Sequence, residues 1–333
     1  MFEQAVVVVK KTALEELLER HNTRSQARFF VESRGADFSE YEAAHEAYRR
    51  ALEALLESLP GGMRQHVVER SFLPNYLFGD KDLVVALGPD GLVANVAKYV
   101  GDQPLLPVNP DPSRVDGVLA AFSVADAGPA AAAARDGACP QRLLTMARAS
   151  LNDGQELHAV NDLFIGRRTH VSALYRIALE GRAEEQSSSG VIVSTGVGST
   201  GWLSSVLGGA AGIALRNDEA ASGMREGGRF DWEARELRFA VREPFVSRTS
   251  EAGLVFGSIP EGESLEIASR MPQDGVIFSD GIEADALPFV SGAIARIEVA
   301  RRRVRLIVPL RIGRGSASPA RASARRARAG TSA

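Results

Sequence analysis

The stretch DLVVALGPDGLVANVAKYV, residues 82–100, decides the fold of the first part of this chain. Its apolar run at 82–87 predicts a buried strand, Gly88-Pro89-Asp90-Gly91 turns the chain, and LVANVAKYV predicts a helix. Open α/β sheets bind ligands where their strands end in such turns. The Asp90 carboxylate is therefore placed to bind a cation or to take a proton from a hydroxyl. A plain turn remains the alternative, because Pro-Asp-Gly is a common turn tripeptide.

The segments around this unit alternate between strands and helices. Short apolar runs predict strands at 6–9, 66–73 and 105–112, and helical spacing predicts helices at 12–21 and 38–59. Strands that alternate with helices favour a parallel sheet.

The second half of the chain has a different pattern. Short alternating runs, such as those at 168–179, 190–195 and 295–308, are separated by Gly, Pro and acidic turns. This pattern is typical of a mostly antiparallel β domain. The low-complexity stretch 123–138 lies before it and indicates a linker or a loosely packed helix.

These patterns predict three parts. An α/β domain with a Rossmann-like parallel sheet occupies 1–125, and a β-rich, mostly antiparallel domain occupies 126–311. The remaining residues, 312–333, are rich in Ala, Ser, Gly and Arg and have almost nothing to bury, so we expect a disordered, arginine-rich tail.

Composition and charge exclude several classes of protein. With 45% hydrophobic and 24% charged residues in a chain of 333, a disordered, collagen-like or coiled-coil protein is excluded. The net charge is −3, and the tail carries five arginines and no acid, which leaves an acidic body that argues against nucleic-acid binding. We find no apolar run long enough to span a membrane and no signal peptide. With one cysteine, Cys139, these features predict a cytoplasmic protein.

The pair Asn161-Asp162 stands just before the apolar run 163–165. An amide beside a carboxylate offers both donors and acceptors, which suits the hydroxyls of a sugar. A turn or a cap is the alternative use of such a pair.

A loop of glycines and small hydroxyl residues follows the apolar run 191–193 and ends at Trp202. Its backbone N–H groups and hydroxyls suit a polyphosphate or nucleotide, and Trp202 offers a stacking surface. Gly196, Gly198 and Gly201 also match the dinucleotide-binding pattern G-x-G-x-x-G, but the antiparallel surroundings argue against that assignment. A glycine-rich hairpin loop remains an alternative, and Asp280-Gly281 further on predicts a hairpin in its own right.

Together, these segments resemble the NAD kinase family, whose members transfer a phosphoryl group from ATP to NAD. The matching segments keep the order of the family: LGPDGL at 87–92, VNPDPSR at 108–114, AVND at 159–162, SGVIVSTGVGSTGW at 189–202 and SDG at 279–281. The resemblance spans about residues 1–310.

The resemblance implies an α/β and a β-rich domain with NAD in the cleft between them, Mg²⁺ and ATP as further requirements, and homodimers or homotetramers. Asp90 is implied as the catalytic aspartate, which orients or deprotonates the 2′-hydroxyl of the adenosine ribose. Asn161 and Asp162 are implied to hold ribose hydroxyls. The remaining implied cofactor-binding residues are Gly88, Gly91, Ser199, Thr200, Gly201, Trp202 and Ser205.

Departures from the family pattern leave other functions open. Pro89 replaces a glycine and removes an N–H donor, Leu92 replaces a threonine, and Ser189 replaces an aspartate. Gly196 stands where the family has proline. A sugar or lipid kinase, a non-catalytic NAD-binding sensor and an oxidoreductase remain alternatives, and polyphosphate is an alternative phosphoryl donor.

Overall fold

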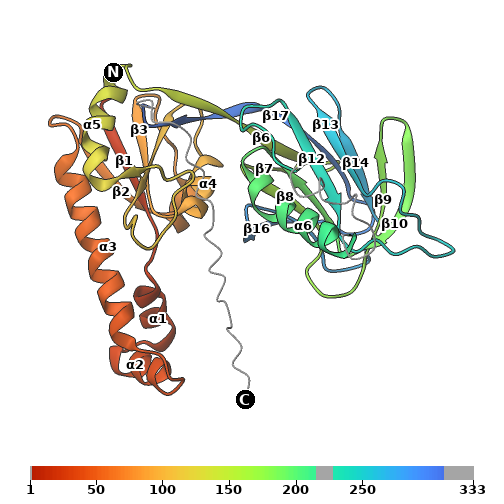
Figure 1. Ribbon diagram of the computed structural model, residues 1–333, viewed down its shortest axis with the longest axis horizontal. Coiled ribbons are helices and arrows are strands. Elements are labelled where there is room, and N and C mark those ends of the chain that lie inside the picture. The colour runs from red at the N-terminus through yellow and green to blue at the C-terminus, as the bar shows by residue number, and fades with distance from the viewer. Residues whose placement is uncertain (1, 215–227, 311–333) are drawn as a thin grey trace, which may run out of the picture.

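The computed structural model describes residues 2–214 and 228–310, arranged as an α/β part and a β-rich part side by side (Figure 1). The tail predicted at 312–333 lies outside the described residues. Among the described residues, no helix is long and apolar enough to cross a membrane.

Parallel strands form the sheet of the α/β part, as the alternating pattern predicts. They lie in the order β4-β3-β1-β2, and the two-residue β5 pairs with the outer edge of β4. The predicted strand at 66–73 begins earlier and ends at Glu69, where a 3-10 helix, Arg70–Asn75, takes over. The bounds are β1 Gln4–Val9, β2 Arg64–Glu69, β3 Asp82–Leu87, β4 Pro104–Asn109 and β5 Phe122–Ser123.

Helices cover both faces of this sheet. Helices α3 (Phe38–Ser58) and α5 (Val124–Arg135) pack on one face, and α4 (Asp90–Ala97) packs on the other. The linker interpretation of 123–138 is wrong, because the alanines of α5 are buried against β3 and β4. This packing favours a domain boundary after α5, and the predicted boundary at 125 stays a prediction.

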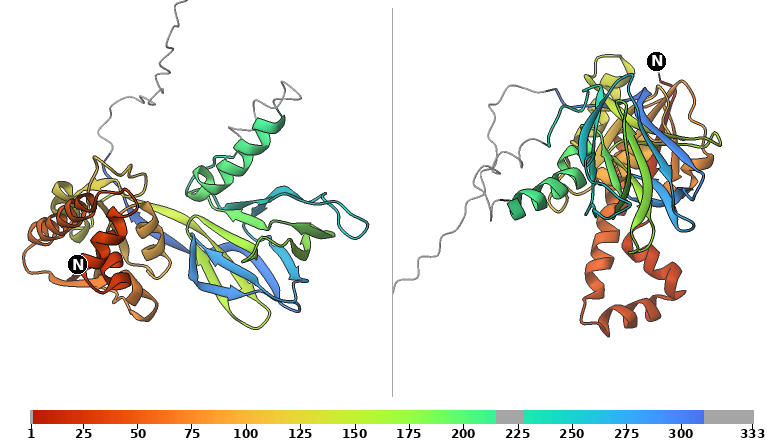
Figure 2. Two further views of the ribbon diagram at one scale, coloured as in Figure 1. Left: turned by 90° about the horizontal axis from the view of Figure 1, so that it is seen from below. Right: turned by 90° about the vertical axis from the view of Figure 1, so that its right-hand side faces the viewer.

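Three helices form an arm that projects from the α/β part (Figures 1 and 2). Helices α1 (Ala13–His21) and α2 (Arg24–Glu32) pack against the beginning of α3 around a small cluster that includes Val31 and Phe38. A capping box at Thr12 begins α1.

The β-rich part contains a six-stranded sheet in which all paired strands are antiparallel, in the order β13-β12-β11-β8-β15-β16. This confirms the fold class expected from the alternating runs. The bounds are β8 Asp162–Arg167, β11 Val191–Ser194, β12 Glu236–Val241, β13 Phe256–Pro260, β15 Gly275–Ser279 and β16 Ile282–Pro288.

The other sheet runs continuously through both parts. Strand β17 (Ile294–Ile307) pairs antiparallel with β14 (Leu265–Ser269) through its first residues and parallel with β4 through Arg305 and Leu306. Strand β6 runs antiparallel beside it for most of its length. The remaining bounds are β6 Gln141–Leu151, β7 Glu156–Ala159, β9 Ala173–Leu179 and β10 Arg182–Ser188.

The side-chain alternation of β8 separates the two faces of the six-stranded sheet. Leu163 and Ile165 point into the core between the sheets, whereas Phe164 points outward. Helix α6 (Trp202–Ala214) packs on that outer face and extends from it (Figure 2). A short 3-10 turn, Gly198–Thr200, leads into α6.

Candidate functional site

Asp90 is the first residue of α4, and its carboxylate bonds to the backbone of a neighbouring loop. One oxygen accepts the N–H groups of Leu119 (3.0 Å) and Ala120 (2.9 Å), and the other accepts the N–H of Val118 (3.0 Å). Three charge-assisted bonds therefore fix this loop to the start of α4. Asp90 is a positioning group in the structure as well as the candidate catalytic aspartate.

Asn109 holds the same loop from its other side. Its Nδ2 donates to the carbonyl of Val115 (2.8 Å), and its Oδ1 accepts the N–H of Asp111 (3.0 Å). Gly117 passes so close that a Cβ there would lie 2.2 Å from the carbonyl oxygen of Ala120. The segments 87–92 and 108–114 thus together hold the loop at 115–120.

The Asp90 region meets the β-rich part in one buried cluster. Leu92 and Leu119 pack in that cluster with Val160 and Val197. Val160 precedes Asn161, and Val197 lies in the glycine loop, so the structure brings together three of the segments that the sequence singles out.

The Asn161 turn and the glycine loop are bound to each other. The N–H of Thr195 donates to the carbonyl of Asn161 (2.9 Å), and its hydroxyl donates to the carbonyl of Val160. A Cβ on Gly198 would lie 2.1 Å from the carbonyl oxygen of Asn161, so only glycine allows this approach.

Asp280 organises the same turn from the predicted hairpin. Its carboxylate accepts the N–H groups of Val160, Asn161 and Asp162 at 2.7–3.3 Å. The hairpin itself is confirmed, with positive φ at Asp280 (53°) and Gly281 (71°). The sequence pattern that predicts the hairpin gives no indication that Asp280 also accepts hydrogen bonds from the Asn161 turn.

Asp162 lies beside Asp280 in an environment that disfavours a second charge. It is 8% exposed, and we find no hydrogen bond to its carboxylate within the described residues. Burial, followed by the neighbouring charge of Asp280, raises the pKa of Asp162 to about 7. Burial also raises the pKa of Asp280 to about 6, against the lowering effect of the backbone N–H groups. Asp162 therefore exchanges a proton near neutral pH.

The other end of α4 is joined to the β-rich part. The Nζ of Lys98 lies 2.7 Å from the carboxylate of Asp285 on β16, and the Tyr99 hydroxyl donates to the same oxygen (3.2 Å). Arg302 on β17 donates to the carbonyl of Lys98 (2.8 Å). Both ends of α4 are thus held by polar contacts.

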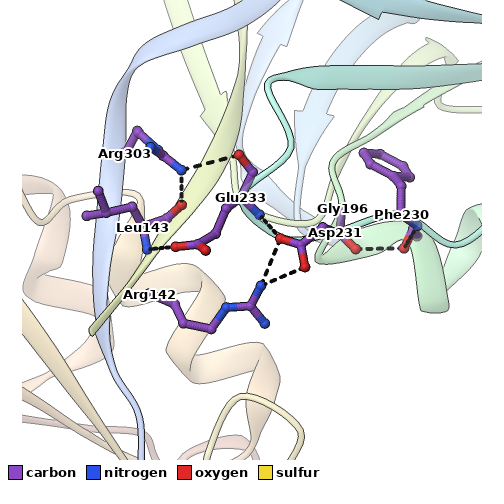
Figure 3. A network of polar contacts seen from close by, with 8 residues as sticks. Arg142, Leu143, Gly196, Phe230, Asp231, Glu233 and Arg303 are labelled. Carbon is purple, nitrogen blue, oxygen red and sulfur yellow. Dashed lines mark hydrogen bonds and ion pairs between the residues drawn. The ribbon is translucent and has the colours of Figure 1, made fainter. Parts of the chain in front are cut away.

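The segment 230–233 clamps the glycine loop to β6 and β17, as Figure 3 shows. Arg142 donates to Asp231 (2.8 and 3.0 Å), and the Leu143 N–H donates to Glu233 (2.7 Å). A Cβ on Gly196 would lie 2.0 Å from the carbonyl oxygen of Asp231. The close approach explains why this chain has glycine where the family pattern has proline.

The other predicted ligand residues fall into different surroundings. Gly91 is open, with no atom within 4 Å of a Cβ built on it, whereas Leu92 fills the space beside Gly88. Ser199 is 1% exposed and donates its hydroxyl to the carbonyl of Gly196 (2.6 Å). Thr200, Gly201 and Ser205 are exposed, and Trp202 is half-buried on the outer face of the six-stranded sheet.

The fold joins an α/β part to a β-rich part through a continuous sheet, with candidate site residues where they meet, and this is an NAD kinase-like fold. Among solved structures, the chain is similar to yeast NADH kinase, whose crystal structure is complexed with NADH. The two chains share 16% sequence identity over 93% of this chain and 84% of that chain, with a TM-score of 0.57. No family model and no curated protein matches this sequence.

Proposed function

We propose that this protein is a kinase that transfers a phosphoryl group from ATP to the 2′-hydroxyl of the adenosine ribose of NAD, giving NADP. The single observation that carries the proposal is that the segments of Asp90 and Asn161 and the glycine loop each contribute apolar residues to one buried cluster. The order of their motifs and the fold shared with yeast NADH kinase support it.

Each side chain at the junction has a proposed part in binding. Asp90 holds the 118–120 loop and orients the ribose hydroxyl with its remaining lone pairs. The open space at Gly91 admits a phosphate to the N–H groups at the start of α4, where the helix dipole also favours an anion. Asn161 offers its amide to a neighbouring hydroxyl.

Asp162 is the proposed acceptor of a hydroxyl hydrogen bond. Its pKa of about 7 means that it is mostly protonated at pH 6 and mostly ionised at pH 8. We therefore expect NADP formation to rise between pH 6 and pH 8. In an Asp162→Asn variant we expect a lower rate without this rise, and an unchanged pH profile in that variant would contradict the role.

Magnesium is proposed as part of the MgATP substrate. The described residues hold no group of three His, Cys, Asp or Glu side chains able to bind a metal ion. Asp90 already accepts three N–H groups, so few ligands are left for a preformed site. Mg²⁺ often binds through phosphates and one or two carboxylates, which matches this arrangement. The homo-oligomer and the cytoplasmic location stay predictions.

The test is an assay for NADP with the purified chain, MgATP and NAD. Parallel reactions replace ATP with polyphosphate, and NAD with NADH, a sugar or a lipid head group. We expect Asp90→Asn to lower NADP formation by a factor of about 100 or more, since a group that orients the reacting hydroxyl is altered. Asp102→Asn, on an exposed loop, serves as the matched control. Absence of NADP in every reaction of the folded wild-type chain would overturn the proposal.

A second candidate, a non-catalytic NAD sensor, is favoured by one observation. Pro89 stands at the N-cap of α4 without an N–H, and Leu92 fills the space beside Gly88 that a phosphate-binding turn would leave open. Tight NAD binding without phosphoryl transfer would select this candidate.

A further inference from the structure

A pocket of about 690 Å³ lies on the arm, at the turn between α1 and α2. Every residue that lines it belongs to the segment 20–34, so neither the Asp90 region nor the glycine loop contributes to it. The arm itself projects away from the sheets of both parts (Figures 1 and 2). The pocket is therefore separate from the candidate kinase site, and the proposed reaction does not require it.

Two phenylalanines supply the apolar part of this pocket. The Phe29 side chain is 74% exposed, although side chains of this kind are usually buried. Phe30 beside it is half-buried, and its ring centroid lies 4.3 Å from that of His21. Aromatic residues and arginines are the residue types that are enriched where proteins contact each other.

Two arginines supply positive charge to the same pocket. The lining segment carries four arginines and one glutamate, within a chain of net charge −3. Arg24 and Arg28 are paired with Glu42 on α3. Within the described residues we find no ion pair to Arg20 or Arg34, and the lining of the pocket contains no carboxylate. These two guanidinium groups are thus left to bind a negative charge from another molecule.

Arg34 is already held in position. Its guanidinium carbon lies 3.7 Å from the centroid of the Phe30 ring, and its Nη1 donates to the carbonyl of Phe30 (2.9 Å). A guanidinium group has five N–H donors, so most of them remain for a ligand. Such a group binds a carboxylate through paired, charge-assisted hydrogen bonds, and a side chain that is already ordered loses little entropy when it does so.

We propose that this pocket binds an acidic segment of a partner protein, with an aromatic side chain of the partner on Phe29 and its carboxylates on Arg20 and Arg34. Charge complementarity selects this occupant. Two guanidinium groups match one or two carboxylates, whereas a nucleic acid or an anionic membrane requires a longer run of basic charge. The neighbouring arginines do not extend the charge, because Glu42 neutralises them.

Binding of the full chain to immobilised polymers, measured by biolayer interferometry, tests the proposal. A random copolymer of glutamate and tyrosine carries both negative charge and aromatic rings, whereas poly-glutamate carries the charge alone. We expect the copolymer to bind more tightly than poly-glutamate, and both to bind more weakly as salt is added. Heparin and vesicles of phosphatidylserine and phosphatidylcholine represent the nucleic-acid-like and membrane surfaces.

Variants of the pocket assign the binding to its residues. Arg20→Gln/Arg34→Gln should bind the copolymer roughly tenfold more weakly, because two charge-assisted contacts are removed. Phe29→Ser should lower the affinity for the copolymer to that for poly-glutamate. The control is Arg50→Gln, an exposed arginine on α3 outside the pocket, which should bind as the wild type does. Thermal unfolding of each variant shows that it is folded.

Four results would overturn the proposal. They are absence of copolymer binding to the wild type, equal affinity for the two polymers, wild-type affinity in the double arginine variant, and tighter binding of heparin or of the vesicles than of the copolymer. A failed NADP assay with intact copolymer binding would remove the kinase function and leave this surface of the arm standing.

Discussion

At the residue scale, the glycines of the glycine loop (195–201) serve mainly to allow close packing. Gly196 and Gly198 each face a backbone carbonyl at a distance that no Cβ tolerates, whereas Gly201 has only one neighbouring atom within 4 Å. The match to a dinucleotide-binding pattern thus arises from glycines that let three chain segments approach one another.

Replacing Gly198 tests this packing role. Gly198→Ala would place a Cβ 2.1 Å from the carbonyl oxygen of Asn161, and we expect it to lower the free energy of unfolding by about 1–3 kcal/mol. Gly208→Ala on α6, where no atom lies within 4 Å, should instead be neutral or stabilising. Urea unfolding of both variants measures the difference, and equal stability would contradict the packing role.

The raised pKa of Asp162 predicts that the free energy of unfolding depends on pH. Its pKa is raised from 3.8 to about 7 in the folded chain, so its favourable contribution is full below pH 4 and is lost as the pH rises through 7. Asp162→Asn should therefore be more stable than the wild type at pH 8, with a smaller gain at pH 5. Urea unfolding at the two pH values checks this. An equal gain in stability at both pH values would contradict a raised pKa of Asp162.

At this scale the sequence singles out residues of the candidate site, and their roles in binding and catalysis stay predictions. Asp90, Asn161 and Asp162 stand out because they lie at the ends of apolar runs, where sheets present polar side chains to ligands. The role of Asp280 could not be inferred, because its bonds to the Asn161 turn join residues about 120 positions apart. No local pattern encodes such a pairing.

At the scale of elements, α4 and the loop that Asp90 holds behave as one unit. Asp90→Asn replaces one acceptor oxygen with an amide nitrogen, which cannot accept an N–H. We expect faster amide hydrogen exchange at Val118, Leu119 or Ala120, while β3 stays protected. Unchanged exchange in all three amides would show that the carboxylate does not hold the loop in solution.

Elements with a strong local signal were predictable, and those that depend on tertiary packing were not. The long helix at 38–58 and the buried strand at 82–87 follow from their periodicity and length. Helix α2 is only nine residues long and is stabilised by packing on α1 and α3. Helix α5 resembles a linker in the sequence because its run of alanines shows no alternation of apolar and polar residues. Which of its faces is buried is decided only by its packing on the sheet.

At the scale of the molecule, the Lys98–Asp285 pair joins the two parts. The Lys98 side chain is only 4% exposed, whereas that of Asp285 is 26% exposed, so removal of Asp285 leaves a buried positive charge. A double-mutant cycle with Lys98→Met and Asp285→Asn should give a coupling energy of about 1–3 kcal/mol. Additive effects of the two substitutions on unfolding would show that the pair does not contribute to holding the parts together.

The strand that belongs to both parts restricts how the molecule can move. Strand β17 keeps hydrogen-bonded partners in each half, and its pairing with β6 shifts register between Val299 and Arg303. A bulge bends and twists more easily than regular ladder. Relative movement of the two parts would therefore proceed as a small torsion of the β6–β17 ribbon about this irregular point, and not as free rotation about a flexible linker.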